Sequence, residues 1–445
     1  MSKPLNLAVV GHTNTGKTSL LRTLLRDGEF GEVKNAAATT RHVERASIVD
    51  GEQTFVYLFD TPGLEDAGGV LDWLEQHTSP RADGIERIEA FLASEASAGD
   101  FNQEAKVLRQ LLQSEVALYV IDAREPVLAK YKDELSVLSW CAKPVMPVFN
   151  FIAEQDLSEW VEMLARRSLH VYSSFDTVAF DFEGEMRLWD NLAAMGTQRE
   201  VLDNLMHTRR KEWAQLDEQA RLQISHFLLN IAAYKQEIDE DEDNSATFNQ
   251  MQNTVRQLER QLHHQLFQLY RFYQPSLTLA DLELKTLRQD PFDLDLLQNY
   301  GIRTGKGAAT GALLGMGIDI ISLGGTLGLG TAIGSVIGGV LPNVQSISDK
   351  LQGKQTLFLD AATLTLLAAR ALEVLQALQA RGHAAQQAVV VQNQHAPWQN
   401  GELPSALNKA RSREKWSALN GYSEPSAQEA RAEYAEQLSR TLKSG

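Results

Sequence analysis

A glycine-rich stretch near the start of the chain has the residue types and the spacing of a phosphate-binding loop. An apolar run at residues 5–10 precedes it, and a helical pattern begins at Ser19 after it. The stretch, called the phosphate loop below, reads Gly11-His12-Thr13-Asn14-Thr15-Gly16-Lys17-Thr18 and follows the pattern G-x-x-x-x-G-K-[ST]. Backbone N–H groups of such a loop and the positive end of the next helix hold a polyphosphate. We therefore expect residues 11–19 to contact phosphates, with Lys17 at the β- and γ-phosphates and the Thr18 hydroxyl on Mg²⁺.

A second group of polar residues follows a predicted β-hairpin, whose strands lie at residues 46–50 and 54–59. Asp60 ends the second strand, where its carboxylate can face the phosphate loop and hold Mg²⁺ through water. The N–H of Gly63 can then contact the γ-phosphate. Upstream of the hairpin, Thr40 can complete the Mg²⁺ shell while a γ-phosphate is present and release it after hydrolysis.

These three motifs, in this order, resemble the Era/TrmE branch of the translation-factor-like GTPases. The resemblance covers about the first 180 residues and implies an α/β, doubly wound P-loop GTPase domain that binds GTP and GDP with Mg²⁺. It favours Thr40 over Thr39 as the switch-one threonine and makes residues 60–63 the switch-two motif. The rest of the chain resembles a helical extension that follows such domains in some bacterial proteins.

Two positions refine the expected mechanism. Leu64 stands where Ras-type enzymes orient the attacking water with a glutamine, and a leucine side chain cannot hydrogen-bond to water. Glu65 and Asp66 are the nearby carboxylates, either water-orienting groups or solvated loop charges, and we take Glu65 as the catalytic candidate. By the same resemblance, Asn14 implies a K⁺ ion beside the phosphates and K⁺-stimulated hydrolysis.

The guanine-reading motif departs from the family pattern. Relatives carry Asn-Lys-x-Asp after the strand that we expect at residues 145–149. Here Asn150 is kept as a candidate nucleotide contact, but Phe151 replaces the lysine and Ala153 replaces the aspartate. Asp156 either takes over base reading or, as we favour, caps the next helix. Guanine preference therefore rests on the remainder of the domain, and use of ATP stays open.

Composition restricts the partners and the compartment. The 445-residue chain has a formal net charge of −16, which argues against a large RNA-binding surface, because such a surface needs a basic face. The basic cluster at residues 409–415 is interpreted as a solvated face. The single cysteine, Cys141, excludes an intrachain disulfide and is expected in the core. No secretory signal begins the sequence, so we expect a cytoplasmic protein.

The length predicts at least two domains. We expect a GTPase domain, a helical hairpin region with an acidic loop, a glycine-rich apolar hairpin, and C-terminal helices with a tail, at residues 1–185, 186–300, 301–345 and 346–445. Apolar residues at helical spacing flank the acidic run at 237–243, which predicts two antiparallel helices joined by a solvated loop. His263 and His264 are expected at the surface, and residues 358–378 are predicted to form one helix.

The segment at residues 305–341 has the pattern of a glycine zipper. Its glycines recur every four residues, which places them on one helix face, at Gly307, Gly311 and Gly315 and at Gly330, Gly334 and Gly338. Residues 320–341 carry no charge and are long enough to cross a bilayer, although Asp319 disfavours a stable span. Three interpretations stay open: a hairpin in the inner membrane, a contact to a membrane protein, and a hairpin packed within the protein.

The sequence as a whole predicts a GTP-driven switch joined to an α-helical effector domain. Lys17 and Mg²⁺ would stabilise the charge that develops as water attacks the γ-phosphate, and Thr40 and Gly63 would report its loss. Two alternatives stay open, a non-catalytic scaffold that nucleotide stabilises and a dynamin-like membrane remodeller. A homo-oligomer is compatible with the scaffold and with the membrane remodeller.

Overall fold

The computed structural model describes most of the first 213 residues and separate stretches of the remainder. The described residues are 3–26, 43–152, 155–175, 182–196, 198–239, 242–270, 285–300, 302, 317–322, 354–380, 397–398, 402–422 and 424–442. The chain divides into two compact units. The first contains the described residues up to Trp213, and the second contains nearly all of those from Ala214 onward.

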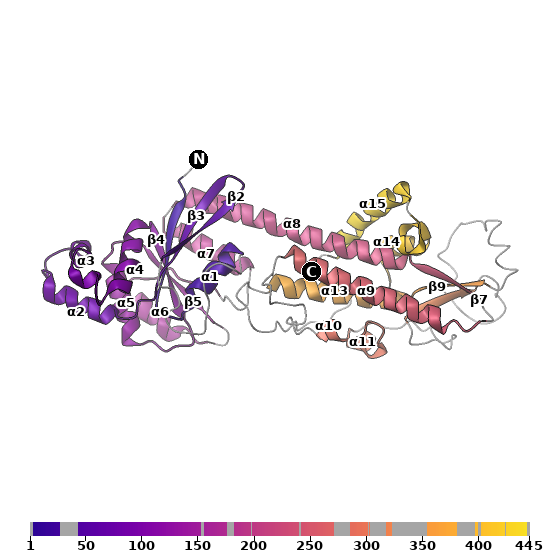
Figure 1. The fold of residues 1–445 in the computed structure, drawn as a ribbon, viewed down its shortest axis with the longest axis horizontal. Coiled ribbons are helices and arrows are strands. Elements are labelled where there is room, and N and C mark those ends of the chain that lie inside the picture. Colours follow the sequence, from indigo (N-terminus) through magenta and orange to yellow (C-terminus); the bar gives the residue numbers. More distant parts are fainter. Residues whose placement is uncertain are drawn as a thin grey trace. The chain divides into compact units, whose positions relative to one another are not determined.

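A six-stranded sheet with helices on both faces forms the first unit (Figure 1). In spatial order its strands are β2 (Glu44–Asp50), β3 (Gln53–Asp60), β1 (Leu5–Val10), β4 (Val116–Asp122), β5 (Val145–Asn150) and β6 (Ser173–Ser174). All neighbours pair in parallel except β2 and β3, which form the predicted antiparallel hairpin. β4 and β5 are buried along their whole length, as expected for a parallel sheet covered on both sides.

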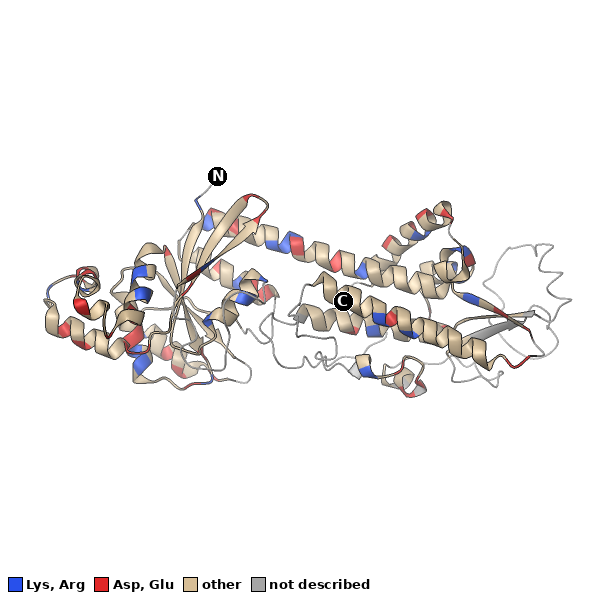
Figure 2. Ribbon diagram, in the orientation of Figure 1, with Lys and Arg blue, Asp and Glu red and all other residues tan. Residues whose placement is uncertain are grey.

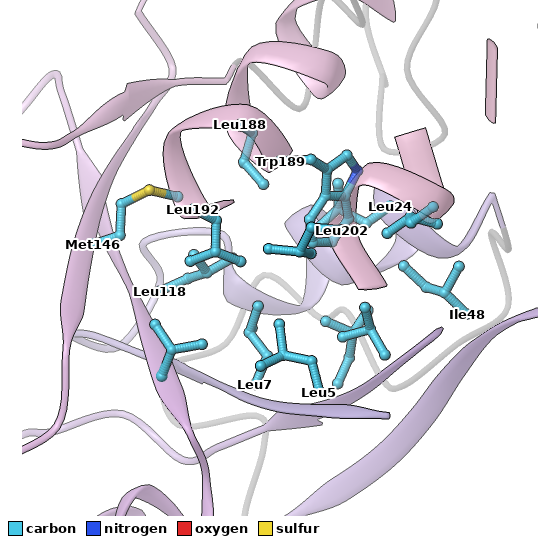
Figure 3. Packing of buried hydrophobic residues seen from close by; sticks show 14 of the residues in the cluster. Leu5, Leu7, Leu24, Ile48, Leu118, Met146, Leu188, Trp189, Leu192 and Leu202 are labelled. Carbon is cyan, nitrogen blue, oxygen red and sulfur yellow. The ribbon is translucent and has the colours of Figure 1, made fainter. Parts of the chain in front are cut away.

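Alternation along β1 divides the core into two layers, because successive side chains of a strand point to opposite faces. Leu5 and Leu7 pack with α1 (Lys17–Leu25), α7 (Phe182–Ala194) and the first part of α8 (Arg199–Ala232), as Figure 3 shows. Ala8 and Val10 belong to the other layer. Its helices are α2 (Ala67–His77), α3 (Gly84–Leu92), α4 (Asn102–Gln113), α5 (Ala129–Ser139) and α6 (Ser158–Ala165).

The first unit extends past the boundary that we expected at residue 185. Trp189 of α7 and Leu202 of α8 are fully buried in the layer beneath β1. The helices that follow the last strand therefore complete the core of the GTPase unit, and the division falls within α8, at Trp213.

The second unit is mostly helical, as predicted. Besides the rest of α8 it contains α9 (Ser245–Leu269), α10 (Lys285–Arg288), α11 (Leu294–Asn299), α13 (Ala361–Ala380), α14 (Ser405–Arg411) and α15 (Pro425–Thr441). It also contains a three-stranded antiparallel sheet with the order β7-β9-β8, formed by β7 (Lys235–Asp239), β8 (Ile318–Ser322) and β9 (Lys354–Leu359).

This small sheet corrects three predictions. The acidic run at 237–243 is not all loop, because β7 pairs with β9 and buries Ile238 between the exposed Glu237 and Asp239. The helix predicted from residue 358 begins at Ala361, after the end of β9. Within the segment expected to form a glycine-rich helical hairpin, residues Ile318–Ser322 form a strand. The rest of residues 305–341, apart from Gly317, lies outside the described residues.

A further correction concerns His263, which is 3% exposed and not at the surface. The neighbouring α13 contains the one stretch among the described helices that is long and apolar enough to cross a membrane, Ala361–Gln379, and 78% of it is buried inside the protein. Arg370 of that helix donates from Nε to Glu259 Oε1 at 2.6 Å and from Nη2 to Oε2 at 3.1 Å. α13 thus has the buried ion pair and the burial of a core helix.

Candidate functional site

The phosphate loop lies between β1 and α1, and its two glycines occupy positions that no other residue fits. A Cβ on Gly11 would lie 2.6 Å from the carbonyl oxygen of Val120, and one on Gly16 would lie 2.3 Å from Asn150 Nδ2. Both glycines also have positive φ angles, of 144° and 89°. The loop is therefore pressed against the ends of β4 and β5, so its backbone is held in place before any ligand arrives.

Lys17 lies across this loop. Its ammonium group donates to the carbonyl oxygens of Gly11 at 3.1 Å and His12 at 2.7 Å. Burial lowers the pKa of Lys17 to about 8, although the charges of Asp60, Glu134 and Glu65 partly oppose the shift. A desolvated cation of this kind gains strongly from an anion placed against it, which suits a phosphate group.

The predicted Mg²⁺ ligands meet. The Thr18 hydroxyl donates to Asp60 Oδ2 at 2.6 Å. Asp60 is 1% exposed, and within the described part of the chain its Oδ1 makes no hydrogen bond. Burial raises the pKa of Asp60 to about 6, against the lowering effects of Thr18 and Lys17. Hydroxyl and carboxylate oxygens with spare capacity fit Mg²⁺, which prefers hard oxygen ligands. Thr40, the other expected ligand, lies outside the described residues, as does Thr39.

The switch-two residues contact the phosphate loop directly. A Cβ on Gly63 would lie 2.0 Å from Thr13 Oγ1 and 2.8 Å from the Thr13 nitrogen, so only glycine allows this approach. The exposed Glu65 accepts a hydrogen bond of 2.8 Å from Thr13 Oγ1. Leu64 between them is 1% exposed and packs in the core. The structure therefore brings Gly63 and Glu65 to the loop and makes Leu64 an apolar anchor.

Sequence reasoning missed two buried glutamates that hold this region. Glu134 Oε1 lies 2.8 Å from His12 Nδ1, which also lies 2.8 Å from the Leu64 carbonyl oxygen, and Glu134 Oε2 accepts from the Tyr119 hydroxyl at 2.7 Å. Glu104, 4% exposed, accepts from the backbone N–H groups of residues 65 and 66. Both glutamates come from helices remote in sequence, and no motif marks them.

On the side where the base is expected, Asn150 supports the loop. Its side-chain amide donates to the Thr15 carbonyl oxygen at 3.1 Å and accepts from the Phe151 N–H at 3.0 Å. The ring of Phe151 lies beside Gly16, and the Arg124 guanidinium carbon lies 4.0 Å from its centroid. An aromatic ring backed by a cation thus takes the place of the lysine of the family pattern.

Asp156, the alternative base reader, accepts the Ser158 N–H at 2.9 Å at the start of α6. The contact is a local turn one residue before the helix, because α6 has Leu157 at its N-cap and no side-chain capping bond, so the capping box that we favoured is not formed. Asn14, the expected K⁺ ligand, is exposed at the tip of the phosphate loop with φ of 65°, in the left-handed region that asparagine tolerates.

Comparisons with known proteins identify the two regions separately. A family model described as "50S ribosome-binding GTPase" matches residues 6–151, and one described as "Domain of unknown function (DUF3482)" matches residues 161–440. The GTPase Der of Chlorobium phaeobacteroides is 34% identical over 112 residues, which cover 25% of each chain. The tRNA modification GTPase MnmE of Chromobacterium violaceum is 29% identical over 172 residues, which cover 36% of this chain and 31% of that protein.

This chain therefore spans only about a quarter to a third of the length of these curated relatives. Among solved structures, a variant of Aquifex aeolicus Era bound to GDP and AlF4⁻ shares 19% identity over 40% of this chain and 52% of that chain, with a TM-score of 0.28. The sequence matches confirm the P-loop GTPase domain that the motifs predicted.

Proposed function

Since the chain belongs to the family described as a domain of unknown function (DUF3482) and carries a GTPase domain ahead of it, we propose that it is a GTP-hydrolysing switch that depends on Mg²⁺. One observation carries this proposal. The Lys17 ammonium, the Thr18–Asp60 oxygen pair and the Gly63 backbone all lie at one preorganised phosphate loop. That is the set of groups that phosphoryl transfer requires, because its catalysis is mostly positioning and charge stabilisation.

Each group has a distinct task in this proposal. Lys17 binds the β- and γ-phosphate oxygens in place of the loop carbonyls that it now contacts. Thr18 and Asp60 hold Mg²⁺, which neutralises charge on the phosphates. Gly63 brings its N–H to the γ-phosphate, and the Glu65 carboxylate orients the attacking water. Asn14 binds K⁺ at the loop tip, which adds positive charge beside the transferred group.

We further propose that the purine base stacks against Phe151, with Arg124 behind the ring. Asp122 holds the Arg124 guanidinium by hydrogen bonds of 2.9 and 2.7 Å, so this platform is rigid. Base–aromatic stacking adds affinity for any purine nucleotide but discriminates weakly between adenine and guanine. We take GTP as the substrate because the family match is to a GTPase.

The switch would act on the helical region. α8 contributes side chains to the core of the first unit and continues into the second, so it is the element that we expect to carry a nucleotide-dependent change. We propose a cytoplasmic protein that contacts the inner membrane or a membrane protein through residues 305–341. Lys and Arg lie interspersed with Asp and Glu along the drawn helices (Figure 2), which supports the expectation that RNA is not a partner.

Phosphate release from GTP by the full chain, with and without Mg²⁺, tests the enzymatic part. We expect Mg²⁺-dependent turnover that Lys17→Ala abolishes together with tight triphosphate binding. A chain that binds GTP but never releases phosphate would favour the scaffold alternative. Binding that is unaltered in Lys17→Ala would show that the site lies elsewhere.

A further inference from the structure

Glu104, in the first turn of α4, accepts hydrogen bonds from the backbone that follows switch two. Its side chain is 4% exposed, and Oε1 accepts hydrogen bonds from the N–H groups of Glu65 at 3.2 Å and Asp66 at 3.0 Å. Asp66 is the N-cap of α2 and accepts the Gly69 N–H at 2.8 Å. The carboxylate therefore ties the turn between switch two and α2 to a helix that carries none of the predicted site residues.

The phosphate loop holds the other end of this turn. The Leu64 N–H donates to the Gly11 carbonyl oxygen at 3.1 Å, and the Leu64 carbonyl oxygen lies 2.8 Å from His12 Nδ1. The backbone at residues 64–66 is thus bound on both sides, by the loop and by Glu104. The Glu65 side chain points from this bound segment to Thr13 at the loop and stays exposed to water.

We propose that Glu104 is a positioning residue for hydrolysis. Its carboxylate holds the Glu65 backbone so that the Glu65 side chain stays over the phosphate loop, where it orients the attacking water. The inference rests on the proposed GTPase function and adds to it a buried residue outside every recognised motif. A shift of about 1 Å in a group that orients a reactant can slow a reaction by about a hundredfold. Loss of the hydrogen bonds to Glu104 should therefore lower the rate of hydrolysis measurably.

Three variants of the full chain test whether the hydrogen bonds to the Glu104 carboxylate matter for hydrolysis. Glu104→Ala removes the acceptor, whereas Glu104→Gln keeps an amide oxygen that can accept from the same N–H groups. Gln110→Ala is the matched control, because Gln110 is also buried on α4 but donates to Ser114, the C-cap of that helix. We expect Glu104→Ala to lower kcat about tenfold to a hundredfold with KM for GTP unchanged. Glu104→Gln should recover most of that loss, and Gln110→Ala should leave kcat unchanged.

A double-mutant cycle with Glu65 separates positioning from general destabilisation. If Glu104 acts through Glu65, adding Glu104→Ala to a Glu65→Ala chain should change kcat by less than about twofold, because the group that it positions is already gone. Additive losses would overturn the inference. So would a Glu104→Ala chain with normal kcat, or one whose defect appears in KM alone. A wild-type chain without turnover would overturn the proposed GTPase function and this inference together.

Discussion

The Thr18 hydroxyl and the Asp60 carboxylate share a hydrogen bond of 2.6 Å, although one lies in the first turn of α1 and the other ends β3. Parallel pairing of β1 with β3 sets Val9 opposite Asp60, which places the Asp60 side chain next to the start of the phosphate loop. The bond therefore assembles two candidate metal ligands before any metal is present. Burial of this carboxyl group, which the bond offsets only in part, raises its pKa to about 6.

Replacing Asp60 with asparagine should separate stability from function. The carboxyl has a pKa of about 6 in the folded chain and an ordinary value of 3.8, so the unfolded chain ionises first as pH rises. Metal-free stability should therefore fall between about pH 4 and pH 6, by up to about 3 kcal/mol. At pH 7 the metal-free Asp60→Asn chain should unfold at a higher temperature than the wild type.

Addition of Mg²⁺ and GDP is the informative half of that experiment. The wild type should gain thermal stability, more so at pH 7 than at pH 5, because Mg²⁺ needs the ionised carboxylate. The Asp60→Asn chain should gain far less. An equal Mg²⁺-dependent gain in both chains would remove Asp60 from the metal site.

Phe151 should contribute to purine affinity without selecting the base. Phe151→Leu keeps an apolar side chain but removes the aromatic face, so the Kd for GTP and for ATP should each rise about tenfold. Phe151→Tyr keeps the face and serves as the control, with affinities close to those of the wild type. Titration of both nucleotides against the three chains checks this. A loss confined to GTP would mean that residue 151 takes part in reading guanine.

Potassium should stimulate hydrolysis through Asn14. We expect turnover in K⁺ buffer to exceed that in Na⁺ buffer by about tenfold or more, the scale on which one preorganised charge acts at a transition state. Asn14→Gly tolerates the positive φ of this position but removes the side-chain oxygen, so the difference between the K⁺ and Na⁺ rates should disappear. Asn14→Asp keeps a side-chain oxygen, so the stimulation by K⁺ should remain. Equal rates of the wild type in the two salts would exclude the K⁺ site.

The buried Arg370–Glu259 pair should make a one-sided substitution costly in the second unit. Arg370→Met leaves the Glu259 carboxylate, 4% exposed, without its guanidinium partner and should lower the free energy of unfolding by about 3 to 5 kcal/mol. Replacing Glu259 with leucine as well should restore much of the loss. Denaturant unfolding followed by probes in each unit measures both effects, and a double variant no better than the single one would contradict this account.

Local patterns were enough to predict the elements of the first unit that carry the candidate site. The phosphate loop, the β2–β3 hairpin and Asp60 each depend on residues adjacent in sequence, and a strand followed by a glycine loop and a helix has few alternative folds. Cys141 is buried as expected, since an apolar helix context predicts burial. These elements bring Lys17, Thr18 and Gly63 together at the phosphate loop.

Contacts distant in sequence could not be predicted in the same way. Glu134 reaches His12 across 122 residues, and Glu104 reaches switch two from a helix whose own pattern is merely amphipathic. β7 could not be predicted because the acidic residues on its exposed side obscure the alternation around Ile238. His263 is buried because it lies four residues after Glu259, on the side of α9 that meets Arg370.

The burial of Trp189 and Leu202 beneath β1 determines where the chain can be truncated to give a stable fragment of the first unit. A fragment that stops at residue 185 would keep α1 on this side of the sheet but lose most of α7 and all of α8, and the apolar area so uncovered promotes aggregation. A fragment that continues to Trp213 keeps that covering. Two helices inside the region matched as DUF3482, α7 and the first part of α8, thus complete the core of the nucleotide-binding unit, so the boundary between the two family matches is not a boundary between two separately folding parts.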